Sequence, residues 1–248
     1  MRGVRTLLVL GATSAIAQAL ARRYSEAGGR CVLAARNVGR LADIAADLRA
    51  RGAPEVVIEI CDFQRDDPDE GTARLLAHSP APDLVLLAWG ALGDQCEAEM
   101  KVGVARETLE SNFVSPALWL LALTRALPRE HASTLVVLGS VAGDRGRQSN
   151  FVYGAAKAGL AALCEGLQHR LHGTSLRVLL VKPGPVDTPM TAHMPRGGMP
   201  FASPDAVAAH IVRAATKGRS ELYTPWFWRW IMLLIRFTPR AILHRTKL

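Results

Sequence analysis

Seven short apolar segments that alternate with helical patterns constrain the fold of this chain more than any other feature. The segments are continuously hydrophobic, as expected of parallel strands that are covered on both faces. They span residues 4–10, 30–35, 55–60, 83–88, 133–138, 176–181 and 221–224. Helical patterns lie between them at 14–27, 37–51, 69–78, 98–127, 150–172 and 203–216.

This alternation predicts an α/β fold, a single doubly wound, Rossmann-like parallel sheet of seven strands with helices on both faces. A chain of 248 residues is long enough to bury such a core in one domain. We expect a catalytic domain over residues 1–224, with a lid loop at about 185–202 that is rich in Pro, Gly and Met. Residues 225–248 are expected to form an aromatic and basic helical extension.

The charge pattern argues against nucleic acid as a partner. The formal net charge is +8, but after Glu221 the chain has no acidic residue and carries four Arg and one Lys. More than half of the excess therefore lies in the tail, and no basic segment with interleaved stacking aromatics appears. The four cysteines lack metal-like spacing, so we expect no metal site and a reducing, cytoplasmic location.

A glycine turn joins the first apolar segment to the first helix. In "LGATSAIAQAL", Gly11 ends the strand and a helix begins at about Ser14. Helix N-terminal amides at such a turn can bind a pyrophosphate, although a purely structural turn is the alternative. The predicted cofactor contacts here are Gly11, Thr13, Ser14, Ala15 and Ile16.

Arg36 follows the second strand, where dinucleotide sites recognise the adenosine ribose. An acidic residue there would bind the 2′-hydroxyl of NAD, whereas a basic residue favours the 2′-phosphate of NADP. The nearest following acid is Asp43, so we predict NADPH rather than NADH; a solvated surface arginine is the alternative. Asp62, after the third strand, could bind the adenine edge or cap a turn.

Ser140, Tyr153 and Lys157 form the strongest pattern in the chain. Ser140 follows the fifth strand, and Tyr153 and Lys157 are four residues apart on one face of the next helix. A neighbouring ammonium favours the phenolate and would lower the pKa of Tyr153 toward working pH. The three side chains are suited to protonating the alkoxide that hydride transfer to a ketone produces.

These motifs resemble the short-chain dehydrogenase/reductase family over nearly the whole chain. The resemblance implies the strand order 3-2-1-4-5-6-7 and Asn112 as a fourth catalytic residue, which would hold a water in a proton relay. It also implies that Lys157 holds the nicotinamide ribose. Further cofactor contacts are expected from Phe63, Gly90, Tyr153, Lys157, Pro183, Gly184, Val186 and Thr188.

The chain departs from the family pattern in two places. Ala15 and Ala17 replace two glycines of the usual phosphate-binding turn, and Leu10 replaces its threonine. Each alanine adds a Cβ where the backbone approaches phosphate. The usual Asn-Asn-Ala-Gly after the fourth strand is here "AWGA", residues 88–91.

Several segments, among them "WGALGD" and "VKPGPVDTPMTAH", are also similar to the decaprenylphosphoryl-2-keto-β-D-erythro-pentose reductases. That resemblance implies NADPH-dependent reduction of the C2 ketone of a polyprenylphosphoryl pentose, which forms an arabinose donor for cell-envelope glycans. A flavin-dependent oxidase that makes the ketone is the implied partner. A soluble reductase of acyl, steroid or other hydrophobic ketones is one alternative, and a non-catalytic dinucleotide sensor is another. The substrate lid would contain Met190, His193, Met194 and Met199.

The tail reads "PWFWRWIMLLIRFTPR" over residues 225–240. We predict that residues 226–246 are mostly helical and lie against either an anionic membrane or a second subunit of a dimer or tetramer. In a single helix the basic side chains would form one stripe of Arg229, Arg236, Arg240 and Lys247, but we expect Pro239 to kink the helix. The longest uncharged run, 230–235, is far shorter than the roughly 20 residues that cross a bilayer. The expected membrane site is peripheral, at the inner face of the plasma membrane.

Overall fold

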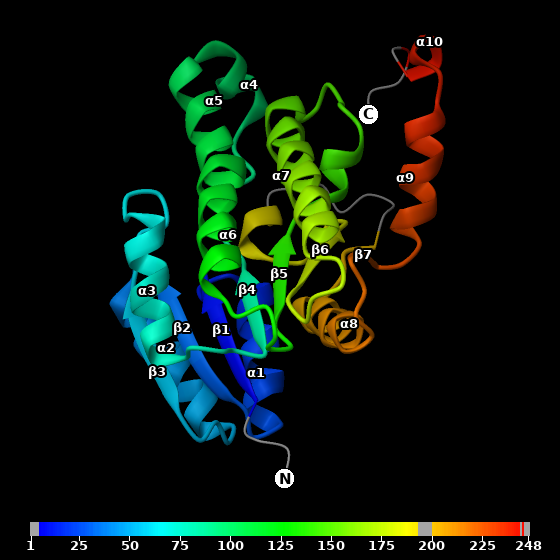
Figure 1. The fold of residues 1–248 in the computed structure, drawn as a ribbon. Helices are drawn as coiled ribbons and strands as arrows, with labels where there is room; N and C mark the ends of the chain where they lie inside the picture. The colour runs from blue at the N-terminus through cyan, green and yellow to red at the C-terminus, as the bar shows by residue number, and fades with distance from the viewer. Residues whose placement is uncertain (1–4, 193–199, 244, 246–248) are drawn as a thin grey trace.

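The computed structural model describes residues 5–192, 200–243 and 245. Its centre is one parallel sheet with the strand order β3-β2-β1-β4-β5-β6-β7, which confirms the predicted fold (Figure 1). The strands are β1 Thr6–Leu10, β2 Arg30–Ala35, β3 Val56–Ile60, β4 Leu84–Leu87, β5 Thr134–Leu138, β6 Arg177–Pro183 and β7 Glu221–Thr224.

Helices cover both faces of this sheet. One layer contains α1 Ala15–Glu26, α2 Val38–Ala50 and α8 Pro204–Thr216, and the other contains α3 Pro68–His78, α6 Ser115–Ala126 and α7 Phe151–Arg170. Successive residues of β1 face opposite layers, so Leu7 packs with the first layer and Leu8 with the second. Both side chains are fully buried, which explains why the strands are apolar without alternation.

The expected single helix over 98–127 is wrong. The segment contains α4 Gln95–Met100, α5 Val102–Leu109, a π-helical turn Glu110–Val114 and then α6. Lys101 takes an extended conformation between α4 and α5 and breaks the helical pattern there. The wide turn inserts an extra residue into the helical ladder, a feature that is frequent at functional sites, and it contains Asn112.

The tail is mostly helical, as predicted, and the helix is interrupted before Pro239. Helix α9 spans Trp228–Phe237 and a short α10 spans Arg240–Leu243. Thr238 is extended because the ring of Pro239 disfavours the helical conformation in the residue before it. The basic stripe is therefore interrupted after Arg236. Within the residues that the structure describes, no helix is long and apolar enough to cross a membrane.

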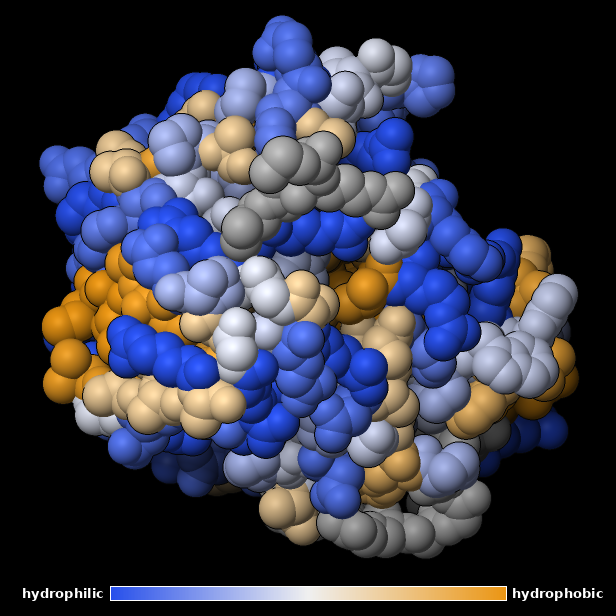
Figure 2. Space-filling model, turned by 90° about the horizontal axis from the view of Figure 1, so that it is seen from below, coloured by the Kyte–Doolittle hydropathy of each residue, from blue (hydrophilic) through white to orange (hydrophobic). Residues whose placement is uncertain are grey.

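A cavity of about 540 Å³ lies near the amino ends of the strands, between α1 and α8. Figure 2 views the molecule from below and shows hydrophobic residues between hydrophilic ones on this face. Two of the lining cations, Arg23 and Arg213, belong to the last turns of α1 and α8. The helix dipole favours cations at these ends, so their charge has a structural reason. Ligands of such sheets bind at the opposite, carboxyl edge.

Candidate active site

A larger cavity of about 610 Å³ lies at the carboxyl ends of the strands. Most of the residues predicted to bind a cofactor line it: Gly11, Thr13, Ser14, Ala15, Ile16, Arg36, Asp62, Phe63, Gly90, Tyr153, Lys157, Pro183, Val186 and Thr188. Asn112 and Met190 also line this cavity, whereas Ser140 and Gly184 are not among its lining residues. His193, Met194 and Met199 lie outside the described residues.

The turn after β1 has the geometry of a phosphate site. Gly11 has a φ of 87°, and a Cβ atom there would lie 2.9 Å from the Ala88 carbonyl carbon, so glycine is required. Its amide donates to the Ala34 oxygen at 2.9 Å, which holds the turn to β2. The first-turn amides of α1 have no intrahelical acceptors, and Ala15 and Ile16 line the cavity, so this turn fits a pyrophosphate. Ala17 is fully buried, so its methyl group packs into the core.

Two arginines line the cavity where the ribose would be recognised. Arg36 follows β2, and Arg40 lies on the first turn of α2, which Asn37 caps by accepting a hydrogen bond from the Arg40 amide at 2.9 Å. Among the described residues neither guanidinium forms an ion pair within the chain. Sequence reasoning missed Arg40, although its spacing of four residues from Arg36 was a usable signal.

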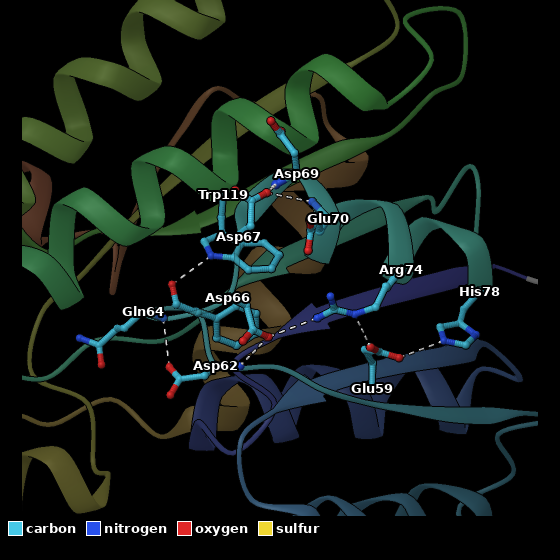
Figure 3. A network of polar contacts seen from close by, with 11 residues as sticks. Glu59, Asp62, Gln64, Asp66, Asp67, Asp69, Glu70, Arg74, His78 and Trp119 are labelled. Atoms are coloured by element: carbon cyan, nitrogen blue, oxygen red, sulfur yellow. Dashed lines mark hydrogen bonds and ion pairs between the residues drawn. The ribbon is translucent and has the colours of Figure 1, made fainter.

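Asp62 caps a turn, which is one of the two roles left open by the sequence (Figure 3). Its Oδ1 accepts from the Gln64 amide at 3.1 Å, and its own amide donates to Asp66 Oδ2 at 3.2 Å. Arg74 then bridges Asp66 at 3.2 Å and Glu59 at 3.0 Å. This network stabilises the connection between β3 and α3, and Asp62 still borders the cavity.

An aromatic cluster lies after β4, where the usual Asn-Asn-Ala-Gly segment would place asparagine side chains. Trp89 stacks on Phe63 with ring centroids 4.4 Å apart and planes inclined at 18°. The indole Nε1 of Trp89 donates to Ser115 Oγ at 3.1 Å, and Ser115 Oγ donates to the Phe63 carbonyl at 2.6 Å. Trp89 therefore ties the end of β4 to the loop after β3 in place of polar side chains. No sequence pattern pointed to this role.

Ser140, Tyr153 and Lys157 meet beside the end of β5. Ser140 Oγ accepts from the Ala142 amide at 3.1 Å, which begins a short 3₁₀ turn over Val141–Asp144, and it hydrogen-bonds the Tyr153 hydroxyl. The Lys157 Nζ lies 5.7 Å from the centroid of the Tyr153 ring. It donates to the Leu138 carbonyl at 3.0 Å. A helix face and a strand end thus bring the three predicted side chains together.

The expected lowering of the Tyr153 pKa is wrong. Burial raises the pKa of Tyr153 to about 12, and the hydrogen bond with Ser140 only partly opposes this. Burial also lowers the pKa of Lys157 to about 8. Both shifts disfavour the charged forms because the two groups lie in the protein interior. A protonated phenol is the form that a proton donor needs.

Asn112 is held by the π-helical turn against Gly90. Its Nδ2 donates to the Ala91 carbonyl at 2.7 Å and to the Thr108 carbonyl at 2.9 Å. Its buried Oδ1 has no hydrogen-bond partner within the described residues. A Cβ atom at Gly90 would lie 2.5 Å from this oxygen and 3.7 Å from Lys157 Nζ. The arrangement leaves an acceptor near Lys157 that a polar group can satisfy.

The predicted lid is tied together at its two ends. Val186 and Ala202 form a parallel bridge, and the Asp187 amide donates to the Ala202 carbonyl at 2.9 Å. Between them, the side chain of Thr191 donates to the Val186 carbonyl and stabilises a short 3₁₀ turn. Met190 belongs to this turn and is 43% exposed at the cavity edge.

A cavity at the carboxyl edge of a doubly wound sheet, with a glycine turn at one end and Ser, Tyr and Lys at the other, defines a nicotinamide-dependent oxidoreductase. The family model described as short chain dehydrogenase matches residues 5–197, and the chain belongs to this family. It is thus an NAD(P)-dependent short-chain dehydrogenase/reductase.

Relatives and solved structures agree with this assignment. An uncharacterized oxidoreductase of Mycobacterium tuberculosis is 38% identical over 246 residues, which cover 98% of this chain and 97% of the relative. An alcohol dehydrogenase from Thermococcus sibiricus, complexed with 5-hydroxy-NADP, has a TM-score of 0.75 and 24% identity, with coverages of 89% and 95%. A variant actinorhodin polyketide ketoreductase with NADPH has a TM-score of 0.77 and 22% identity, with coverages of 90% and 96%. These two likenesses concern the fold.

Proposed function

We propose that this enzyme reduces a ketone with NADPH and that Tyr153 donates the proton. The observation that carries the proposal is the position of Tyr153 beside Lys157 and Ser140, in the cavity that the glycine turn also lines. The bound nicotinamide cofactor supplies the hydride. Ser140 holds the carbonyl oxygen, Lys157 stabilises negative charge on the phenol oxygen, and Asn112 anchors the path that returns a proton. A non-catalytic sensor has no need of this set.

We further propose that the ketone belongs to a hydrophobic or lipid-linked molecule, with the C2 keto group of a polyprenylphosphoryl pentose as the leading candidate. Support comes from the segments shared with such reductases, from Met190 at the cavity edge, and from the apolar tail. A flavin-dependent oxidase would supply the ketone. The test is NADPH oxidation by purified enzyme with a prenylphosphoryl keto-pentose and with short ketones. A higher kcat/KM for a short ketone or a steroid would favour the soluble-reductase alternative.

The cofactor preference provides a direct prediction. NADPH is expected to bind more tightly than NADH, because Arg36 and Arg40 face the ribose side of the cavity. Replacing Arg36 with Asp should weaken NADPH binding roughly 10- to 100-fold, the effect of losing a charged hydrogen bond of about 1.5–3 kcal/mol. Fluorescence titration with both nucleotides measures this change. Arg219→Asp, an exposed site outside the cavity, is the control. Wild-type enzyme that prefers NADH would contradict the prediction.

The outer face of α9 supports a peripheral membrane location. Trp226 is 70% exposed, Trp230 61% and Leu234 75%, and no acid follows Glu221. Apolar side chains with interspersed arginines suit the headgroup region of an anionic bilayer, here the cytoplasmic face of the plasma membrane. The alternative occupant is a second subunit of a dimer or tetramer.

We expect the enzyme to sediment with anionic vesicles at low salt and to be released at high salt. Trp230→Ala should weaken vesicle binding because it removes apolar area worth about 25 cal/mol per Å² from the interface. Leu118→Ala, an exposed apolar site on α6, should leave binding unchanged. Binding that is absent at low salt, with a Trp230 variant that instead dissociates an oligomer, would assign the face to subunit contact.

A further inference from the structure

The inner face of α9 packs against the loop that carries Ser140. Trp228 is 3% exposed and Met232 is fully buried, and both belong to one apolar cluster with Val141. Val141 is the residue directly after Ser140. The part of the tail that faces the protein therefore contacts the active-site loop, which neither a membrane nor a second subunit explains.

Trp228 also fills the space beside Gly184. A Cβ atom at Gly184 would overlap the Trp228 Nε1, so the indole occupies the volume that any other side chain at this position would need. The Gly184 amide donates to the Thr224 carbonyl at 3.1 Å, which ties this segment to the end of β7. Pro183, the preceding residue, lines the cavity. One indole ring thus packs between two segments of the site.

Ion pairs and hydrogen bonds anchor the far end of the same loop. Asp144 accepts from Tyr223 at 2.8 Å and pairs with Lys182 at 2.8 Å. Arg145 donates to the carbonyls of Arg236 and Thr238, each at 3.4 Å, at the C-terminal end of α9. Residues of β6, β7 and α9 therefore hold the turn that follows Ser140 at both of its ends.

We propose that Trp228 is a positioning residue of the active site, which holds the Ser140 loop and the Pro183–Gly184 segment in reactive geometry. This inference rests on the proposed ketone reduction. Trp228 acts through Val141 and Gly184 and does not line the cavity itself. Hydride and proton transfer require close alignment, so a small displacement of the loop lowers kcat more than it weakens cofactor binding. The tail is then not separable from catalysis, contrary to its description as an extension.

The test compares two tryptophans of one helix with a short soluble ketone, NADPH and no vesicles. Trp228→Ala is expected to lower kcat roughly 10- to 100-fold, the effect of a small misplacement of reacting groups. The Kd for NADPH should stay near wild type, because Trp228 lies against neither the glycine turn nor Arg36. Trp230→Ala should keep wild-type kcat, because its side chain points to solvent. Equal losses in both variants would overturn the proposal.

Two further readouts separate positioning from a general loss of packing. Trp228→Phe should recover most of the kcat, because the ring still fills the site and the Nε1 has no partner within the described residues. In alcohol oxidation, Trp228→Ala should shift the rising limb of kcat/KM to higher pH, because weakening the Ser140 hydrogen bond raises the Tyr153 pKa. If Trp228→Ala has a normal kcat and the same pH dependence of kcat/KM as wild type, the contact is only structural.

Val141→Ala keeps the proposal testable if Trp228→Ala does not fold. It trims the same contact from the loop side and should also lower kcat with little change in NADPH affinity. Wild-type kcat in Val141→Ala would overturn the proposal.

If the wild-type enzyme reduces no ketone, the proposed function fails, and the fluorescence emission of bound NADPH becomes the readout for the position of Pro183–Gly184. Altered emission in the Trp228 variant then supports positioning of Pro183–Gly184, and unchanged emission excludes it.

Discussion

Tyr153→Phe is expected to lose most turnover while still binding NADPH. The ring that fills the buried site remains, and only the hydroxyl bonded to Ser140 is removed. Loss of general acid catalysis lowers the rate by about 10²- to 10⁴-fold. Steady-state NADPH oxidation gives kcat, and fluorescence titration gives the Kd for the cofactor.

Tyr223→Phe is the control for this variant. Its side chain is half-buried and the hydroxyl donates to Asp144 at 2.8 Å, but it lies outside the cavity. It should retain far more activity than Tyr153→Phe. A Tyr153 variant with near wild-type turnover would remove the residue from the proposed role and favour a different proton donor.

Lys182→Met is expected to destabilise the folded protein strongly. The Lys182 ammonium is 9% exposed and pairs with Asp144 at 2.8 Å and with Glu221 at 2.7 Å. The Asp144 side chain is only 3% exposed, so removing the cation leaves a buried carboxylate whose remaining hydrogen bond within the described residues comes from Tyr223. Such an uncompensated charge typically costs about 3–5 kcal/mol. Denaturant unfolding measures the change.

Arg74→Met is the matched control. Arg74 also bridges two carboxylates, Glu59 at 3.0 Å and Asp66 at 3.2 Å, but its side chain is 44% exposed. The expected loss is about 0–1 kcal/mol, because solvent screens surface pairs. The double variant Lys182→Met/Asp144→Leu should regain much of the lost stability. Equal losses for Lys182→Met and Arg74→Met would show that burial does not strengthen the Lys182 network.

Residue pattern was sufficient for the sheet because each strand carries its own signal. Leu7 and Leu8 face opposite helical layers, so burial on both faces is visible as an unbroken apolar run. The strand order followed from the resemblance to the short-chain dehydrogenase/reductase family. The long connection around Asn112 was misjudged because a π-helical turn and a helix leave nearly the same periodicity.

The catalytic side chains were predictable where their spacing in the sequence places them close together. Tyr153 and Lys157 lie on one helix, and Ser140 ends a strand, so sequence order alone brings them to one edge of the sheet. The pKa of Tyr153 was not predictable in this way. The pKa depends on how far the surrounding protein removes the hydroxyl from water, and the residues that do so are distant from Tyr153 in the chain.

Sequence alone determined the fold, the family and the likeness of the site to a nicotinamide reductase, because these depend on short-range patterns. Tertiary structure decided the neighbours that are distant in the chain: Trp89 on Phe63, and Trp228 against Gly184. In the tail, the sequence shows which residues are apolar but not which face is already covered. Trp228 and Trp230 are two residues apart with the same chemistry, yet packing on Val141 buries one and leaves the other to solvent.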